Sequence, residues 1–311
     1  MVDIFGLGLA IYALTVWAIA SIVYKWGLGH TEPKANLFFR LCCVTIGTLI
    51  FTLIFGNIFI FSILSTQESM DFIIACIISG LSVTVGDLLY YMALKRIDAS
   101  RAYPIIQLNL IFIYPFAFFL FGETITPAIL IGATFILSSV FLLSMNDKPK
   151  EGIEKSNAQN KETEKLTQGI IISIIAAFLW ALSAISFNQA RIISSDVFST
   201  NFFRVLVSVM VFSIWGIFKR DYYGAFKKEN RKYMKYFVYI GIAGMFSLGF
   251  ADTLYYKAVE INGLVLTTTF TVNTPMVQQI LSVLILKEKL RKKFILAVTL
   301  IIVGNYIIIF F

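Results

Sequence analysis

Ten apolar runs of about 17–25 residues follow one another along this chain. A helix of about 20 apolar residues spans the ~30 Å hydrocarbon core of a bilayer, and a helix satisfies its backbone polar groups internally, as a lone strand does not. We therefore expect an all-α integral membrane protein. The predicted helices lie at about 4–25, 36–56, 71–93, 101–121, 126–145, 168–188, 198–218, 236–258, 264–286 and 293–311.

The composition supports this class, because 58% of the residues are hydrophobic and only 14% are charged. A soluble domain of this size needs a more highly charged surface. The net charge of +8 comes from basic residues at helix ends, so we expect the chain to contact lipid headgroups and not nucleic acid. Cys42, Cys43 and Cys76 all fall within apolar runs, which argues against a disulfide framework or a metal site.

Short motifs recur in the same order in the two halves of the chain, at spacings of 163, 164, 165 and 165 residues. The matched pairs are Trp17 and Trp180, Arg40 and Arg204 (each in Phe-Phe-Arg), Asp87 and Asp252 (each just before a Tyr-Tyr pair), and Glu123 and Glu288. The sequence thus predicts a five-helix repeat over 1–145 and a second over 167–311. The segment 146–166 between them is polar, has no aromatic residue, and is predicted to be a loosely ordered linker.

The basic residues predict the orientation of the chain. Five helices is an odd number, so the second repeat should be inverted relative to the first. Lys and Arg collect on every second connection, whereas the opposite connections hold only Arg191 and Lys257. The positive-inside rule places the crowded connections, including 146–166, in the cytoplasm. We therefore expect both termini outside, in a multi-pass protein of the plasma membrane.

These motifs resemble the drug/metabolite transporter superfamily, specifically its EamA-like ten-helix members. The motifs are Trp17-Ala18, Phe39-Arg40-Leu41, Tyr91-Met92-Ala93-Leu94 and Gly122-Glu123-Thr124, with their second copies and Thr274-Pro275. The resemblance covers nearly the whole chain and implies a transporter, although the family carries many kinds of metabolite. Many members are described with cytoplasmic termini, whereas the charges here favour termini outside.

Four charged residues lie well inside the predicted membrane helices, away from their ends, where a charge costs at least ~2.5–3.5 kcal/mol. Asp87 and Asp252 are predicted at corresponding depths on opposite sides of the midplane, and Arg40 and Arg204 at similar depths on neighbouring helices. Two interpretations remain open. The aspartates act as gates or protonation sites, or each forms a structural ion pair with its arginine.

Polar side chains concentrate in the predicted helices 101–121 and 264–286. They line a central cavity, as the resemblance also implies, or they make interhelical hydrogen bonds. Trp17 and Trp180 likewise form a cavity wall or pack in the core. The candidate substrate-binding residues are Trp17, Tyr103, Gln107, Asn109, Trp180, Thr271, Asn273, Gln278 and Gln279. One tyrosine of each pair, Tyr90–Tyr91 and Tyr255–Tyr256, should face inward.

Two further expectations concern the connections. Glu123 and Glu288 should each cap the helix that follows them. The basic, aromatic segment 219–236 should lie on the lipid headgroups.

The sequence contains no nucleotide-binding loop, metal cluster or nucleophile motif, so neither an enzyme nor a cofactor is expected. We predict a secondary transporter that moves a small polar or zwitterionic metabolite, amino acids first, by alternating access, with proton coupling left open. The alternatives are an uncoupled facilitator or channel, and an efflux carrier for lipophilic cations. Because one chain supplies both repeats, a monomer should suffice.

Overall fold

The computed structural model describes residues 2–144, 157–287 and 293–310, and within these residues all regular structure is helical. In order, the first helices are α1 (Ile4–Leu28), α2 (Pro33–Phe55), η1 (Ile60–Ser62), α3 (Thr66–Arg96), α4 (Ala99–Ile106), α5 (Asn109–Phe121) and α6 (Pro127–Ser144). The remaining helices are α7 (Asn157–Ser194), α8 (Val197–Phe218), η2 (Tyr222–Phe226), η3 (Lys228–Tyr233), α9 (Met234–Gly244), the π-helix η4 (Met245–Ala251), α10 (Asp252–Asn262), α11 (Leu264–Thr271), α12 (Thr274–Leu286) and α13 (Phe294–Phe310).

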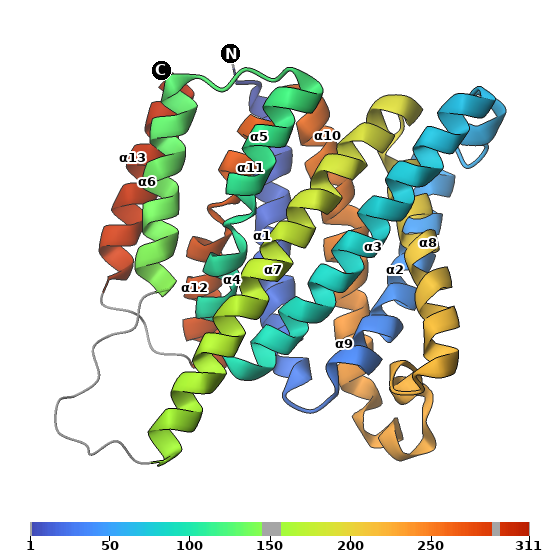
Figure 1. Cartoon of the computed structure of the whole chain (residues 1–311), viewed down its shortest axis with the longest axis vertical. Coiled ribbons are helices and arrows are strands. Elements are labelled where there is room, and N and C mark those ends of the chain that lie inside the picture. The colour runs from blue at the N-terminus through green and yellow to red at the C-terminus, as the bar shows by residue number, and fades with distance from the viewer. Residues whose placement is uncertain (1, 145–156, 288–292, 311) are drawn as a thin grey trace.

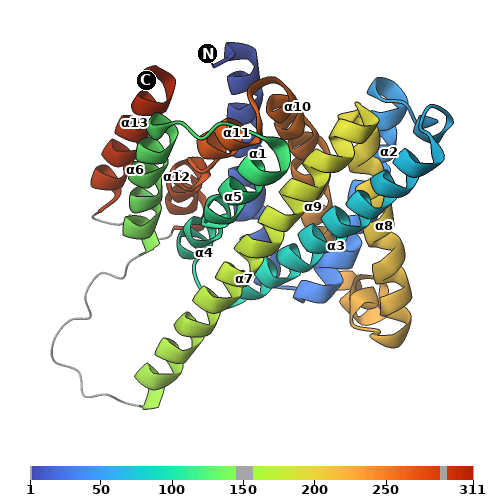
Figure 2. The same cartoon turned by 45° about the horizontal axis from the view of Figure 1, so that its top comes forward.

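The helices form an elongated bundle in which α1 starts and α13 ends at the same end (Figure 1). Among the described residues, seven helical stretches are long and apolar enough to cross a membrane, and two shorter apolar stretches lie at Pro127–Ser139 and Phe294–Phe310. Helix α3 packs along α7, α2 along α8, and α1 against α10 and α12 (Figure 2). Elements of the two halves of the chain therefore interleave around the centre of the bundle.

Two helices that the sequence predicts as continuous are broken near their middle. The predicted helix 101–121 is interrupted between α4 and α5, and 264–286 between α11 and α12. At the second break, Pro275 has no N–H to donate to the carbonyl of Thr271, and the Thr274 hydroxyl donates to it instead. At the first break, the backbone N–H groups of Leu108, Leu110 and Ile111 donate to the third preceding carbonyl. The breaks bring non-helical backbone into the middle of the bundle.

Two other boundaries differ from expectation. Helix α7 begins at Asn157, so the second half of the predicted linker is helical; the stretch 157–166 is rich in the helix formers Ala, Gln, Glu and Lys. The first part of the linker lies outside the described residues. The predicted helix 236–258 contains the seven-residue π-helix η4, which ends directly before Asp252. A π turn widens the helix and is frequently found at functional sites.

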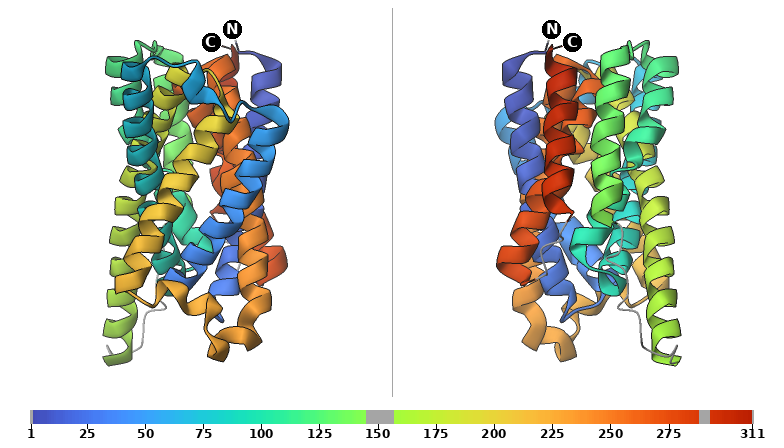
Figure 3. Two further views of the ribbon diagram at one scale, coloured as in Figure 1. Left: turned by 90° about the vertical axis from the view of Figure 1, so that its right-hand side faces the viewer. Right: turned by 90° about the vertical axis from the view of Figure 1, so that its left-hand side faces the viewer.

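Helices α6 and α13 lie side by side at one edge of the bundle (Figure 3). Their contact depends on two glycines, because a Cβ added to Gly132 would lie 2.6 Å from the carbonyl oxygen of Gly304. A Cβ on Gly304 would lie 2.7 Å from the carbonyl oxygen of Gly132. Small residues at such a contact let two backbones approach closely.

Candidate functional site: a central cavity

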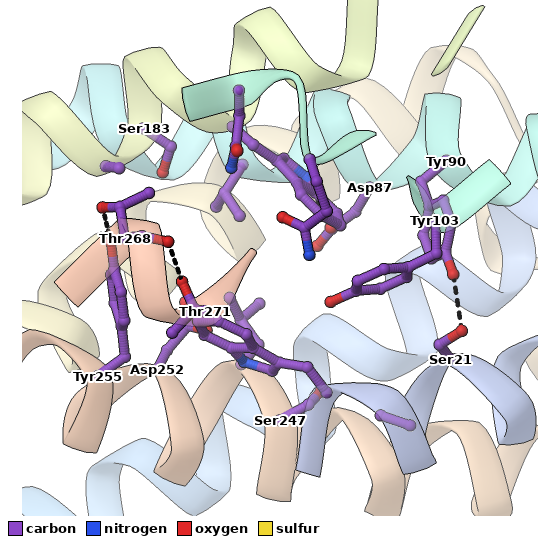
Figure 4. A pocket seen from close by; sticks show the side chains of 18 of the residues that line it. Ser21, Asp87, Tyr90, Tyr103, Ser183, Ser247, Asp252, Tyr255, Thr268 and Thr271 are labelled. Atoms are coloured by element: carbon purple, nitrogen blue, oxygen red, sulfur yellow. Dashed lines mark hydrogen bonds between the residues drawn. The ribbon is translucent and has the colours of Figure 1, made fainter. Parts of the chain in front are cut away.

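A cavity of about 120 Å³ lies in the centre of the bundle. Residues of α1, α3, α4, α5, α7, η4, α10 and α11 surround it, together with Arg40 of α2 and Arg204 of α8 (Figure 4). Its volume is below the ~300–1,000 Å³ usual for pockets that hold drug-sized ligands. In this conformation it suits a small ligand.

The four predicted membrane charges all line this cavity as two ion pairs, the first buried and the second partly buried. Arg40 Nη2 pairs with Asp87 Oδ2, and Arg204 Nη2 lies 2.8 Å from Asp252 Oδ2. The Arg40 guanidinium also donates to the Tyr91 hydroxyl at 3.1 Å. The formal charges of the four residues cancel. Both aspartates therefore lie in one cavity and not in two separate sites.

Each aspartate also accepts a hydrogen bond from a tryptophan of the other half of the chain. The Trp17 indole N–H donates to Asp252 Oδ1 at 3.0 Å, and the Trp180 indole N–H donates to Asp87 Oδ1 at 3.1 Å. A Cβ on Gly86 would lie 2.6 Å from Trp180 Cδ1, so the glycine beside Asp87 leaves room for that ring. Each of the two aspartates thus forms an ion pair with an arginine of its own half of the chain and accepts a hydrogen bond from an indole of the other half.

The second ion pair is held by an amide that sequence analysis missed. Asn201 Oδ1 accepts from Arg204 Nε at 3.1 Å and from Nη2 at 2.7 Å. Its amide nitrogen donates to the carbonyls of Leu248 and Gly249 in η4, at 2.9 and 2.7 Å. Leu37 occupies the corresponding place before Phe-Phe-Arg in the first half. The π-helix and Asn201 therefore distinguish the second pair from the first.

The structure brings most of the predicted cavity residues together. Trp17, Tyr103, Gln107, Asn109, Trp180 and Thr271 line the cavity. Tyr90 lines it and Tyr91 does not, but both Tyr255 and Tyr256 do. These positions show where the side chains lie; their part in substrate binding stays a prediction.

Three predicted residues do not line the cavity. Asn273 donates to Asn305 Oδ1 of α13 at 2.9 Å. Gln278 and Gln279 are buried elsewhere on α12, and neither amide atom of Gln278 has a hydrogen-bond partner among the described residues. All three residues follow α11, whose Thr268 and Thr271 line the cavity, and the break before α12 separates them from that helix.

Other lining residues were not predicted. They are mostly small hydroxyl and apolar side chains: Ala20, Ser21, Tyr24, Val83, Ile113, Ser183, Ala184, Ser247, Leu248 and Thr268. A usable signal was present, because Ser21 lies four residues after Trp17 and Ser183 three after Trp180, on the same helix faces. Tyr90 donates to Ser21 at 2.9 Å, and Tyr255 shares a 2.7 Å hydrogen bond with Thr268 (Figure 4).

Some residues that line the cavity have buried side-chain polar atoms with no hydrogen-bond partner among the described residues. They include Arg204 Nη1 and Arg40 Nε, which are donors, and Asn109 Oδ1, an acceptor. A buried polar atom without a partner costs about 1–3 kcal/mol. Such atoms are the natural contacts for a ligand that carries both an acceptor and a donor.

Glu123 caps a helix, but not the one that was predicted. Its two carboxylate oxygens accept from the backbone N–H groups of Leu264 and Val265, at 2.7 and 2.8 Å. These residues begin α11 in the other half of the chain, whereas in the following helix, α6, the backbone N–H of Ile129 donates to the Thr126 hydroxyl oxygen. Glu288 lies outside the described residues. No group of His, Cys, Asp and Glu that could hold a metal ion occurs in the described part of the chain.

A sequence model of the EamA-like transporter family matches residues 4–145 and 167–310. The chain belongs to the EamA-like transporter family. This confirms the family that the duplicated motifs predict. An EamA-like chain of this kind is a membrane transporter, which agrees with the apolar helices described above.

Relatives of this EamA-like protein include an uncharacterized transporter of Clostridium kluyveri, 24% identical over 245 residues, or 78% of this chain and 73% of the relative. An uncharacterized transporter of Archaeoglobus fulgidus is 22% identical over 180 residues, 58% of this chain and 57% of the relative. A solved crystal structure is similar with a TM-score of 0.69 at 17% identity, over 98% of this chain and 96% of its own. At that identity the likeness concerns the fold alone.

Proposed function

We propose that this EamA-like transporter carries a small zwitterionic metabolite, amino acids first, across the plasma membrane by alternating access. The observation that carries the proposal is that two residues lining one small cavity have buried polar atoms without a hydrogen-bond partner among the described residues: a donor, Arg204 Nη1, and an acceptor, Asn109 Oδ1. An α-carboxylate would accept from the arginine, and an α-ammonium would donate to the asparagine. The substrate would then satisfy both buried atoms.

The balance of charge supports a substrate without net charge. Asp87, Asp252, Arg40 and Arg204 sum to zero, so a net ion entering the cavity would be left without a counter-charge. The aromatic walls favour the rival, a lipophilic cation, through cation–π contact, since seven lining residues are Trp or Tyr. A lipophilic cation, however, offers no acceptor to Arg204.

In this proposal the carrier is a monomer of ten membrane helices, formed as two inverted five-helix repeats. The broken helices α4–α5 and α11–α12 support it, because transporters with inverted repeats typically bind substrate at discontinuous helices near the midplane. The end with the basic connections faces the cytoplasm and both termini face outside. Reaction of single cysteines, introduced beside Asp3 and at Lys228, with an impermeant maleimide tests this orientation.

The substrate class is tested by thermal-shift screening of the purified protein against amino acids, amines, nucleotide sugars and lipophilic cations. A ligand at ten times its Kd stabilises the folded state by about 1.4 kcal/mol. We expect a shift with amino acids, lost in Asn109→Ala and kept in Asn305→Ala, a change of the same type away from the cavity. Stabilisation by lipophilic cations alone would contradict the proposal and favour an efflux carrier for such cations. Single-channel conductance would contradict it and favour a channel.

A further inference from the structure

A second hollow lies at the end of the bundle opposite the termini. It has a volume of about 620 Å³, and it is formed by the α1–α2 turn, the last turn of α3, and the connection between α8 and α9. We call it the basic hollow, after the four cationic side chains that line it: Lys34, Lys95, Arg96 and Lys227. The central cavity shares no residue with it.

The carboxylates in the basic hollow balance only part of its positive charge. Glu32 and Asp221 are its acidic lining residues. Lys95 lies 2.9 Å from Glu32 and Lys34 lies 3.2 Å from Asp221. The acidic partners are 78% and 67% exposed, and exposed pairs of this kind contribute only about 0–1 kcal/mol. An entering anion can therefore compete with them.

Two cations of the basic hollow are not engaged by carboxylates. Within the described residues, neither Arg96 nor Lys227 forms an ion pair. The N-terminus of α2 opens at the same place, and Glu32 at its N-cap makes no side-chain capping bond. The positive end of a helix dipole and its first N–H groups attract an anion, phosphate above all.

Exposed aromatic rings surround this end of the bundle. Trp26 of α1 and Phe226 of η2 are 42% and 58% exposed, and the Trp26 ring packs against Tyr236 and Tyr239 of α9. Exposed Trp and Tyr side chains next to basic residues mark the depth at which a bilayer presents its headgroups. A ligand bound here can thus have its phosphate in the hollow and its chains in the lipid.

We propose that the basic hollow binds a phosphate group, that of an anionic phospholipid headgroup first. The phosphate would lie between Arg96, Lys227 and the start of α2. Each basic residue near an anionic headgroup changes binding by about fivefold. The site is independent of the central cavity, so its test does not depend on which metabolite the protein carries.

The experiment titrates the detergent-solubilised full-length protein with phosphatidic acid or phosphatidylcholine and measures thermal stability and lipid retention by native mass spectrometry. Phosphatidic acid should stabilise the protein more strongly than phosphatidylcholine. Lys227→Gln should weaken phosphatidic acid binding about fivefold. Glu32→Gln should strengthen it, because it removes the carboxylate that competes for Lys95. Lys228→Gln, a change of the same charge on the neighbouring residue outside the hollow, should leave it unchanged.

Inorganic phosphate at millimolar concentration distinguishes the source of the group. Stabilisation by inorganic phosphate with the same dependence on Lys227 and Glu32 supports the phosphate site and assigns it to a soluble phosphate. If phosphatidic acid binds with this dependence on Lys227 and Glu32 and inorganic phosphate does not bind, the result supports a phospholipid headgroup as the source. Equal binding of the two lipids, or equal losses in Lys227→Gln and Lys228→Gln, would overturn the proposal.

Discussion

The indole nitrogen of Trp17 lies 3.0 Å from Oδ1 of Asp252, a residue 235 positions further along the chain. The matching bond joins Trp180 to Asp87 at 3.1 Å. In this crossed arrangement, the indole of each half of the chain donates to the aspartate of the other half.

Trp17→Phe and Asp252→Asn should be energetically coupled, because the first removes the donor of one hydrogen bond and the second removes the negative charge of its acceptor. We expect a coupling free energy of unfolding of about 0.5–3 kcal/mol from the double-mutant cycle. Trp17→Phe combined with Asp87→Asn is the matched control and should show a smaller coupling, because the indole of Trp17 donates to Asp252 and Asp87 accepts from Trp180 instead. Denaturation in mild detergent measures the free energy of unfolding of the natural protein, the three single variants and the two double variants. Equal coupling in both cycles would contradict the crossed arrangement.

Arg40→Met should lower the free energy of unfolding by about 3–5 kcal/mol, because it leaves the buried Asp87 carboxylate unpaired. Lys34→Met, which breaks the exposed pair with Asp221, should cost no more than about 1 kcal/mol. The double variant Arg40→Met with Asp87→Leu should recover part of the loss, since no lone charge remains. Failure of the second change to recover any stability would show that packing of Arg40, and not its charge, is the main contribution.

Transport tests the coupling interpretation of the aspartates. If Asp87 and Asp252 carry protons, Asp87→Asn should abolish gradient-driven uptake in proteoliposomes while exchange of labelled for unlabelled substrate continues. Asp252→Asn is expected to behave in the same way, because its carboxylate has the same kinds of partner, an arginine and an indole. The same pH dependence of uptake in both variants as in the natural protein would leave the aspartates as structural ion pairs.

Glu123→Gln should destabilise the protein by about 1 kcal/mol, because the Glu123 carboxylate accepts from two N–H groups at the start of α11. Gly263→Ala should be damaging for a second reason: its φ is +82°, and the new Cβ would lie 3.2 Å from Glu123 Oε2. Thermal unfolding of the single variants measures both effects. An unchanged midpoint in Glu123→Gln would mean that water caps α11 equally well.

Gly132→Ala should lower stability, whereas Gly8→Ala should be neutral or stabilising. The Cβ at Gly132 would lie 2.6 Å from the Gly304 carbonyl oxygen, a backbone atom that cannot turn aside, while a Cβ at Gly8 meets nothing within 4 Å. Alanine also has the higher helix propensity by ~1 kcal/mol, which adds to stability at the open site. Equal unfolding temperatures of Gly132→Ala and Gly8→Ala would contradict the close contact between α6 and α13.

The sequence was a good guide where the membrane dictates the structure. Runs of apolar residues predict helices because lipid allows few alternatives, and the duplicated motifs predict the family. The four buried charges could be found because a charge in a membrane helix needs a partner. Their crossed indole partners could not, since the bonds join residues of different halves whose packing is set by the whole bundle.

Local breaks account for most of the remaining errors. Asn273 was predicted in the cavity because polar side chains concentrate in the predicted helix 264–286; in the structure it follows α11 at the break and donates to Asn305. Glu123 was assigned to the helix that follows it, because sequence shows neighbours along the chain and not the distant α11. The composition of the π-helix before Asp252 does not differ from that of an ordinary helix, so the sequence does not predict it. Its hydrogen bond with Asn201 of α8 is likewise known only from the structure.

The glycine contact between α6 and α13 has a mechanical consequence. Helix α6 follows α5 in the chain and α13 follows α12, so each member of this pair is tied to one of the two broken helices. Because Gly132 and Gly304 bring the two backbones together, α6 and α13 should move as a single lever. A shift of α5, which lines the central cavity, would then be passed to α12 through the contact between α6 and α13.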